Sequence, residues 1–200
     1  MTAKRGMPGG LLWGLPITLF LALVAALVIN WAEASRMKIP VLGDVPSFQL
    51  TERSGKSIDR SDLDGKLHVI DFFFTSCPVV CPLMMSNLKP LYDLYANSDK
   101  IEFLSISVDP DNDSLAAMQA YAERVGITDD RWLLARAPIE EVSNLMEKGF
   151  MIDSADLPGG HPTHYILVDA QGRIRGYYPY DDEGAIYLLK QHIRELAREM

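Results

Sequence analysis

The chain has 200 residues, of which 48% are hydrophobic, and its formal net charge at pH 7 is −8. This length and hydrophobic content allow one sizeable buried core, so we expect a single folded domain and an anchor. All 27 acidic residues follow Trp31, whereas Lys4 and Arg5 precede it. The acidic balance after Trp31 argues against a nucleic acid as a partner.

The first predicted element is a transmembrane helix at residues 11–31. No residue from Leu11 to Asn30 is charged, and about 20 apolar residues are what a bilayer-spanning helix requires. Lys4 and Arg5 favour a cytoplasmic N-terminus at residues 1–10 and export of the remainder. We expect a single-pass protein of the inner membrane, with its C-terminal domain in the periplasm or the mitochondrial intermembrane space. A cleaved signal peptide is the alternative, because Ala32-Glu33-Ala34 has the form of a cleavage site.

A linker at residues 32–45 leads to the domain at residues 46–200. Residues 46–51 alternate apolar and polar side chains as a strand does, and a turn follows at residues 53–56. The run Leu67–Phe74 is nearly continuous in hydrophobic residues, which predicts a strand covered on both faces, as in parallel sheets. Residues 61–66, which precede the strand at Leu67–Phe74, are predicted to form a turn or one helical turn.

The remaining elements alternate between helices and strands. Helical spacing follows at residues 83–95, where Pro90 should kink or interrupt the helix. A helix at residues 114–125 is expected to be capped by Asp113 or Ser114 and closed by Gly126. The other predictions are strands at 101–108, 132–135, 165–169 and 173–178 and helices at 139–148 and 183–199. This α/β order predicts a thioredoxin-like fold, with a central mixed sheet flanked by helices.

Cys77 and Cys81 are the only cysteines, and they directly follow the predicted strand that ends at Phe74. Four residues of helix separate Cα atoms by about 6 Å, so a disulfide is within reach. The spacing is one residue longer than the Cys-x-x-Cys of redox enzymes. The pair is therefore a redox-active disulfide, a stabilising disulfide or half of a metal site.

Metal binding requires further ligands. Zinc takes four ligands, whereas Cu(I) prefers soft sulfur and accepts two thiolates and one imidazole. His161 is the favoured imidazole, because it follows Gly159-Gly160 in a loop, and His164 is the alternative. His68 and His192 are expected to be structural. Met84 and Met85 are expected to fill the core rather than to act as transient ligands.

Four segments of the sequence together carry a resemblance to a known family. They are the Cys-Pro-x-x-Cys-Pro-like motif in Phe74–Pro82, the Ser-Val-Asp-Pro segment within Ile106–Asp113, His161 followed by the strand Tyr165–Asp169, and Gly172-Arg173. With this combination the sequence resembles the Sco/SenC family, the thioredoxin-fold copper chaperones of cytochrome oxidase assembly. The resemblance covers residues Val45–Arg198 and the single N-terminal anchor.

The resemblance implies that Cys77, Cys81 and His161 bind copper, as Cu(I) with Cu(II) as a second state. The metal would be delivered to the CuA centre of cytochrome c oxidase subunit II. Other copper chaperones or thioredoxin-like reductases would be further partners. Asp109 would orient the site or a partner. Two departures stand out: Val79 occupies a position that is often acidic in the family, and His164 is an additional histidine.

Two enzymatic functions compete with that of a metallochaperone. A thiol-disulfide reductase would keep the copper-binding cysteines of the oxidase subunit reduced. A thiol peroxidase would need a low-pKa cysteine, and nothing near Cys77 in the sequence supplies a clear cation. Ser107-Val108-Asp109 and His161 have no obvious use in thiol exchange alone, so their presence favours metal binding.

Overall fold

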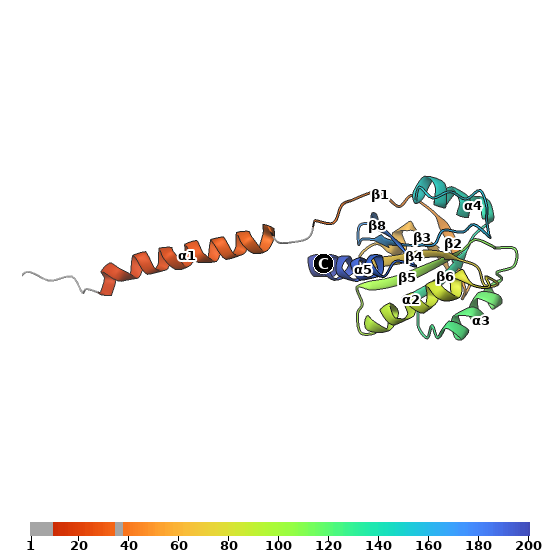
Figure 1. Cartoon of the computed structure of the whole chain (residues 1–200), viewed down its shortest axis with the longest axis horizontal. Coiled ribbons are helices and arrows are strands. Elements are labelled where there is room, and N and C mark those ends of the chain that lie inside the picture. Colours follow the sequence, from red (N-terminus) through yellow and green to blue (C-terminus); the bar gives the residue numbers. More distant parts are fainter. Residues whose placement is uncertain (1–9, 35–37) are drawn as a thin grey trace, which may run out of the picture. The chain divides into compact units, whose positions relative to one another are not determined.

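The computed structural model describes residues 10–34 and 38–200. The chain divides into two units, Met1–Lys38 and the compact unit Ile39–Met200, both drawn in Figure 1. The compact unit thus begins at Ile39. The sequence patterns predict a later start for the domain, at residue 46.

The described part of the first unit contains helix α1 (Gly10–Ala34), which includes Pro16. Among the described residues, no helix combines the length and the apolar character that crossing a membrane demands. The assignment of residues 11–31 to a membrane span stays a prediction. The predicted cytoplasmic N-terminus at residues 1–10 lies outside the described residues, apart from Gly10.

The second unit is built on one mixed sheet of eight strands in the order β1-β8-β7-β4-β5-β6-β2-β3. Strands β4, β5 and β6 run parallel to one another, and the other pairings are antiparallel. The strands are β1 (Gly43–Asp44), β2 (Gln49–Glu52), β3 (Ser57–Asp59), β4 (Leu67–Phe73), β5 (Ile101–Ser107), β6 (Trp132–Arg136), β7 (His164–Val168) and β8 (Arg173–Pro179).

Helices cover both faces of this sheet (Figure 1). One apolar core joins the sheet to α2 (Val80–Leu94), α3 (Leu115–Val125) and α5 (Glu183–Glu199). A second core on the opposite face contains α4 (Ile139–Asn144) and the π-helical turn η2 (Leu145–Gly149), and it includes Leu63 of the 3-10 helix η1 (Arg60–Leu63). Strand β4 serves both cores: Val69 and Phe73 face the first, and Ile70 and Phe72 face the second. Burial on both faces explains the continuous hydrophobic run in this strand.

The predicted central mixed sheet with flanking helices is confirmed, with three local differences. Strands β1 and β3 are too short for an alternating pattern to reveal them, and β1 lies within the predicted linker at residues 32–45. Helix α2 continues through Pro90. The helix predicted at residues 139–148 is an α-helix only as far as Asn144, and the chain then forms the π-helical turn η2. The predicted ends of α3 are confirmed. Ser114, and not Asp113, is the N-cap, because its hydroxyl accepts a hydrogen bond from the N–H of Ala117, and Gly126 closes the helix with φ of 80°.

Candidate metal centre

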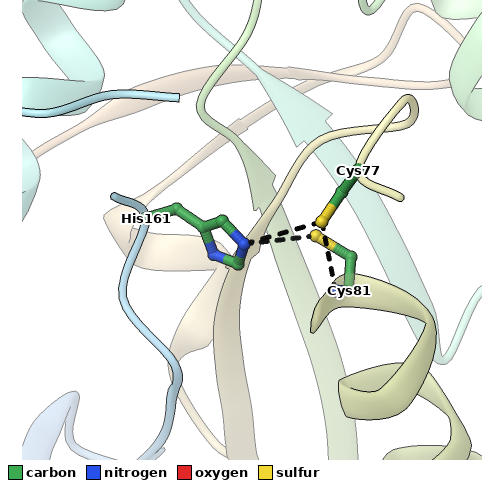
Figure 2. Close-up of side chains that lie close together, drawn as sticks. All are labelled: Cys77, Cys81 and His161. Atoms are coloured by element: carbon green, nitrogen blue, oxygen red, sulfur yellow. Dashed lines mark hydrogen bonds between the residues drawn. The ribbon is translucent and has the colours of Figure 1, made fainter. Parts of the chain in front are cut away.

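The two cysteines lie where β4 gives way to α2. Cys77 is in the loop that follows Phe73, and Cys81 is in the first turn of α2. His161 comes from the loop between η2 and β7, about eighty residues further along the chain. Figure 2 shows the three side chains converging on one point. The site therefore lies beyond the carboxyl end of a parallel strand, where ligands gather in open α/β sheets.

The three donor atoms lie close enough together to hold one metal ion. Both thiols are free, and the donor atoms of Cys77, Cys81 and His161 all lie within 4.8 Å of one another. His161 Nε2 is 3.9 Å from Cys77 Sγ and 3.5 Å from Cys81 Sγ. A sulfur and a nitrogen bound to one ion at about 2.3 and 2.0 Å, the bond lengths typical of zinc, with a 120° angle between them would be about 3.7 Å apart. The two observed separations bracket that value.

Cys77 caps helix α2 with its sulfur. The N-cap residue, Val79, makes no side-chain hydrogen bond, and the backbone N–H of Cys81 donates to Cys77 Sγ at 3.3 Å instead. Partial burial opposes ionisation of the Cys77 thiol, but the N–H groups at the start of α2 favour the thiolate and hold its pKa below the ordinary value. A thiolate at a helix N-terminus is stabilised in this way.

Cys81 and His161 are almost fully buried, with 0% and 6% of their surfaces exposed. Burial strongly raises the pKa of the Cys81 thiol and lowers the pKa of His161. His161 Nδ1 lies 3.1 Å from the carbonyl oxygen of Pro162. A proton on Nδ1 would be donated to that carbonyl, which leaves the Nε2 lone pair directed at the thiols. Phe74 packs edge-on against the imidazole, with ring centroids 5.5 Å apart.

A buried carboxylate holds the loop that carries Cys77. Asp113 accepts hydrogen bonds from the backbone N–H and the hydroxyl of Thr75 and from the hydroxyl of Ser107. Asp113 is 0% exposed, so it ties the end of β5 to a residue two positions before Cys77. Asp109, which the family resemblance suggested for an orienting role, instead accepts hydrogen bonds from the side chain of Asn112.

The alternative ligand His164 lies elsewhere. It is the first residue of β7 and pairs with Pro179. Because side chains alternate along a strand, His164 lies on the same face as Ile166 and Val168, which belong to the second core. Cys81 belongs to the first core. The group of donors found among the described residues contains His161 and not His164.

The remaining predicted residues take separate positions. His68 is buried in β4 with Nε2 3.3 Å from Glu102 Oε2, and His192 in α5 lies 2.6 Å from the Tyr178 hydroxyl. Met84 is fully buried in the first core, as predicted for core filler. Met85, which is 3% exposed, lines a groove that also contains Cys77.

Sequence reasoning missed two supporting residues. Asp113 precedes a helix, and an aspartate in that position is most simply interpreted as an N-cap. Phe74 belongs to a hydrophobic run, so its edge contact with His161 had no separate signal in the sequence.

Comparisons with known proteins identify the family of this chain. A family model described as SCO1/SenC matches residues 43–198. The SCO1 protein homolog of Bacillus subtilis is 27% identical over 159 residues, which cover 74% of this chain and 82% of that protein. The crystal structure of a SCO1/SenC family lipoprotein from Bacillus anthracis superposes with a TM-score of 0.73 and 27% identity, covering 80% of this chain and 99% of that one. Bradyrhizobium japonicum ScoI with copper bound gives a TM-score of 0.56 and 26% identity, over 74% and 98% of the two chains. Because the family model spans nearly the whole compact unit, the chain belongs to the SCO1/SenC family.

Proposed function

We propose that this protein binds Cu(I) through Cys77, Cys81 and His161 and delivers it to the CuA centre of cytochrome c oxidase subunit II. The observation that carries the proposal is the convergence of two free thiols and one imidazole nitrogen within 4.8 Å. The copper-bound structure of the B. japonicum relative supports the choice of metal. Two thiolates and a neutral imidazole suit Cu(I), and the group of three donors among the described residues is one short of a tetrahedral zinc site.

Ligand exchange is the mechanism that this geometry favours. Both thiols must lose their protons to bind the metal, so copper binding releases protons. The burial of Cys81 and His161 shields their bonds to the ion, whereas Cys77 is partly exposed. An incoming thiolate of the recipient would therefore displace Cys77 first. Release of the two buried ligands would follow.

A copper titration tests the ligand set. The reduced full-length chain in a neutral detergent competes with a chromophoric Cu(I) chelator, as do its Cys77→Ala/Cys81→Ala, His161→Ala and His164→Ala variants. We expect one copper per chain, an affinity at least about tenfold weaker in His161→Ala, and no change in His164→Ala. Stoichiometric binding that survives the loss of both cysteines would refute the site. Weakening in His164→Ala alone would move the third ligand to that residue.

The destination of the copper needs its own measurement. The loaded chain is mixed with a reduced soluble CuA domain of subunit II, the two are separated, and copper is counted on each. We expect transfer to the CuA domain, and no transfer to a CuA domain whose copper-binding cysteines are replaced by serine. Retention of all copper on the chain would contradict the proposed delivery.

A thiol-disulfide reductase is the second candidate, and the unlike thiols favour it. Cys77 is the more acidic and more exposed thiol and would attack a partner disulfide, forming a mixed disulfide and releasing one partner thiol. Cys81, after losing its proton, would then displace the second partner thiol and form the Cys77–Cys81 disulfide. Incubation of the metal-free chain with an oxidised CuA peptide tests this function. A Cys81→Ser variant should accumulate the mixed disulfide, and the absence of exchange would restrict the thiols to metal binding.

The location of the protein is part of the same proposal. We infer that residues 11–31 anchor the chain in the inner membrane and that the domain faces the periplasm or the mitochondrial intermembrane space. The uncharged run and the preceding Lys4 and Arg5 support this orientation. Protease added to intact spheroplasts should digest the domain. Protection until the membrane is lysed would contradict the orientation.

A further inference from the structure

A groove of about 850 Å³ runs between α2 and α3 and reaches Cys77. Its walls are largely apolar, and they come from Pro82, Met85 and Pro90 on α2 and from Tyr121 and Val125 on α3. Cys77 is the most exposed of the three proposed ligands. A group that displaces Cys77 from a metal can therefore approach it along this groove.

The groove also contains a cation that no carboxylate neutralises among the described residues. Arg124 is exposed, its guanidinium lies over the Tyr121 ring at 4.9 Å, and it donates a hydrogen bond to the carbonyl oxygen of Thr75. Lys89, in the same groove, is paired with Asp93 at 2.7 Å. The sequence showed no clear cation near Cys77, because Arg124 lies forty-seven positions away and reaches the loop only through the packing of α3.

We propose that this groove binds an extended segment of the recipient protein in which a cysteine lies within about three residues of a carboxylate. The inference deepens the proposed function, since it rests on a partner that approaches Cys77. Arg124 contacts Thr75, two residues before Cys77, and two residues of extended chain span about 7 Å. A carboxylate on Arg124 would therefore hold a cysteine of the same segment close to Cys77.

The net charge of the whole chain opposes the binding of an acidic segment. The protein carries a formal net charge of −8, so its overall field repels an acidic peptide. A preference for an acidic segment must therefore come from a local positive group. Arg124 is that group, and the effective dielectric constant near a protein surface, which is lower than that of bulk water, strengthens its attraction for a carboxylate at close range.

The test uses the reduced, metal-free full-length chain in a neutral detergent. Three synthetic peptides carry one cysteine as a mixed disulfide with uncharged 2-thiopyridine, flanked by glutamate, lysine or glutamine. The Cys77 thiolate attacks the peptide sulfur, the probe disulfide breaks, and pyridine-2-thione leaves and is measured by its absorbance. We expect the acidic peptide to react about tenfold faster than the basic one at low salt, and the ratio to fall toward one at high salt.

Variants assign the preference to the groove. Arg124→Gln keeps an amide donor for Thr75 but loses the charge, so its acidic-to-basic rate ratio should fall to one or below. Arg124→Lys should retain the preference, as should Lys56→Gln, a matched loss of positive charge on an exposed residue outside the groove. The glutamine peptide should react equally with all four proteins, which shows that Cys77 itself is unchanged.

Three results would overturn the proposal. Equal rates for the acidic and basic peptides in the unsubstituted chain would show that the groove does not select charge. A ratio unchanged in Arg124→Gln would place the selectivity elsewhere. A 2-thiopyridyl disulfide of glutathione that outpaces the acidic peptide would make the groove a site for a small thiol. This experiment contains no copper, so a negative result would not contradict the proposed metal site. Likewise, a negative copper titration would not contradict a measured preference for the acidic peptide.

Discussion

Cys77 and Cys81 are four residues apart but have opposite electrostatic surroundings. The start of α2 lowers the pKa of Cys77, while burial raises that of Cys81. Since the thiolate is the nucleophile, iodoacetamide at pH 7.5 should modify Cys77 at least about tenfold faster, as measured by peptide mass mapping of the metal-free chain. In the Cys77→Ser variant, iodoacetamide should still modify Cys81 slowly. Equal rates for the two thiols, or faster modification of Cys81, would contradict these surroundings.

Asp71 is a fully buried carboxylate on β4, on the same face as Val69 and Phe73. Ser105 donates a hydrogen bond to its Oδ1, whereas Oδ2 has no partner among the described residues. Burial raises its pKa to about 7. The folded protein therefore binds this proton more tightly than the unfolded chain does. The protonated Asp71 carboxyl therefore makes its full contribution to the free energy of unfolding below about pH 4, and this contribution is lost as the pH rises toward 7.

Asp71→Asn removes this titration and keeps an acceptor for Ser105. The variant should exceed the unsubstituted chain in free energy of unfolding at pH 8.5, by up to about 4 kcal/mol, and the difference should shrink at pH 5. Urea unfolding at both pH values measures it. Asp99→Asn, at an exposed position, serves as the control. A pH-independent difference between Asp71→Asn and the unsubstituted chain would contradict the raised pKa.

At the scale of elements, the loop after β4 depends on the loop after β5. Asp113→Ala would leave the Thr75 N–H and the Ser107 hydroxyl without their acceptor. We expect a loss of about 2–3 kcal/mol in the free energy of unfolding and weaker Cu(I) binding, because Cys77 would lose its fixed position. Asp109→Ala is the matched control and should change neither by much. If the two variants behave alike in urea unfolding and in copper titration, Asp113 does not position the loop.

The loop before β7 places His161 through a close backbone approach. A Cβ atom on Gly160 would lie 2.7 Å from Asp156 Cβ, whereas one on Gly159 would meet only the Asp156 carbonyl oxygen at 3.9 Å. Gly160→Ala should therefore displace His161 and weaken Cu(I) binding about tenfold. Gly159→Ala should bind Cu(I) normally in the same titration. The opposite order of the two variants would contradict this role of Gly160.

At the scale of the whole molecule, sequence patterns predicted the sheet, most of its helices and the three converging residues. Cys77 and Cys81 could be identified as candidate site residues from the sequence, because they follow the continuous hydrophobic run of a strand buried on both faces. The choice between His161 and His164 could not be made from periodicity, since it depends on where β7 begins and on which face each of its residues lies. The two-residue strand β1 and the contacts of Asp113 and Arg124 depend on pairings between distant segments, which no local pattern records.

X-ray absorption spectroscopy of the full-length chain loaded with one Cu(I) tests the central claim most directly. We predict two sulfur ligands and one imidazole nitrogen. The imidazole scattering should disappear in His161→Ala and persist in His164→Ala. Coordination by sulfur alone in the unsubstituted chain, or imidazole scattering that survives in His161→Ala, would contradict a site made of Cys77, Cys81 and His161.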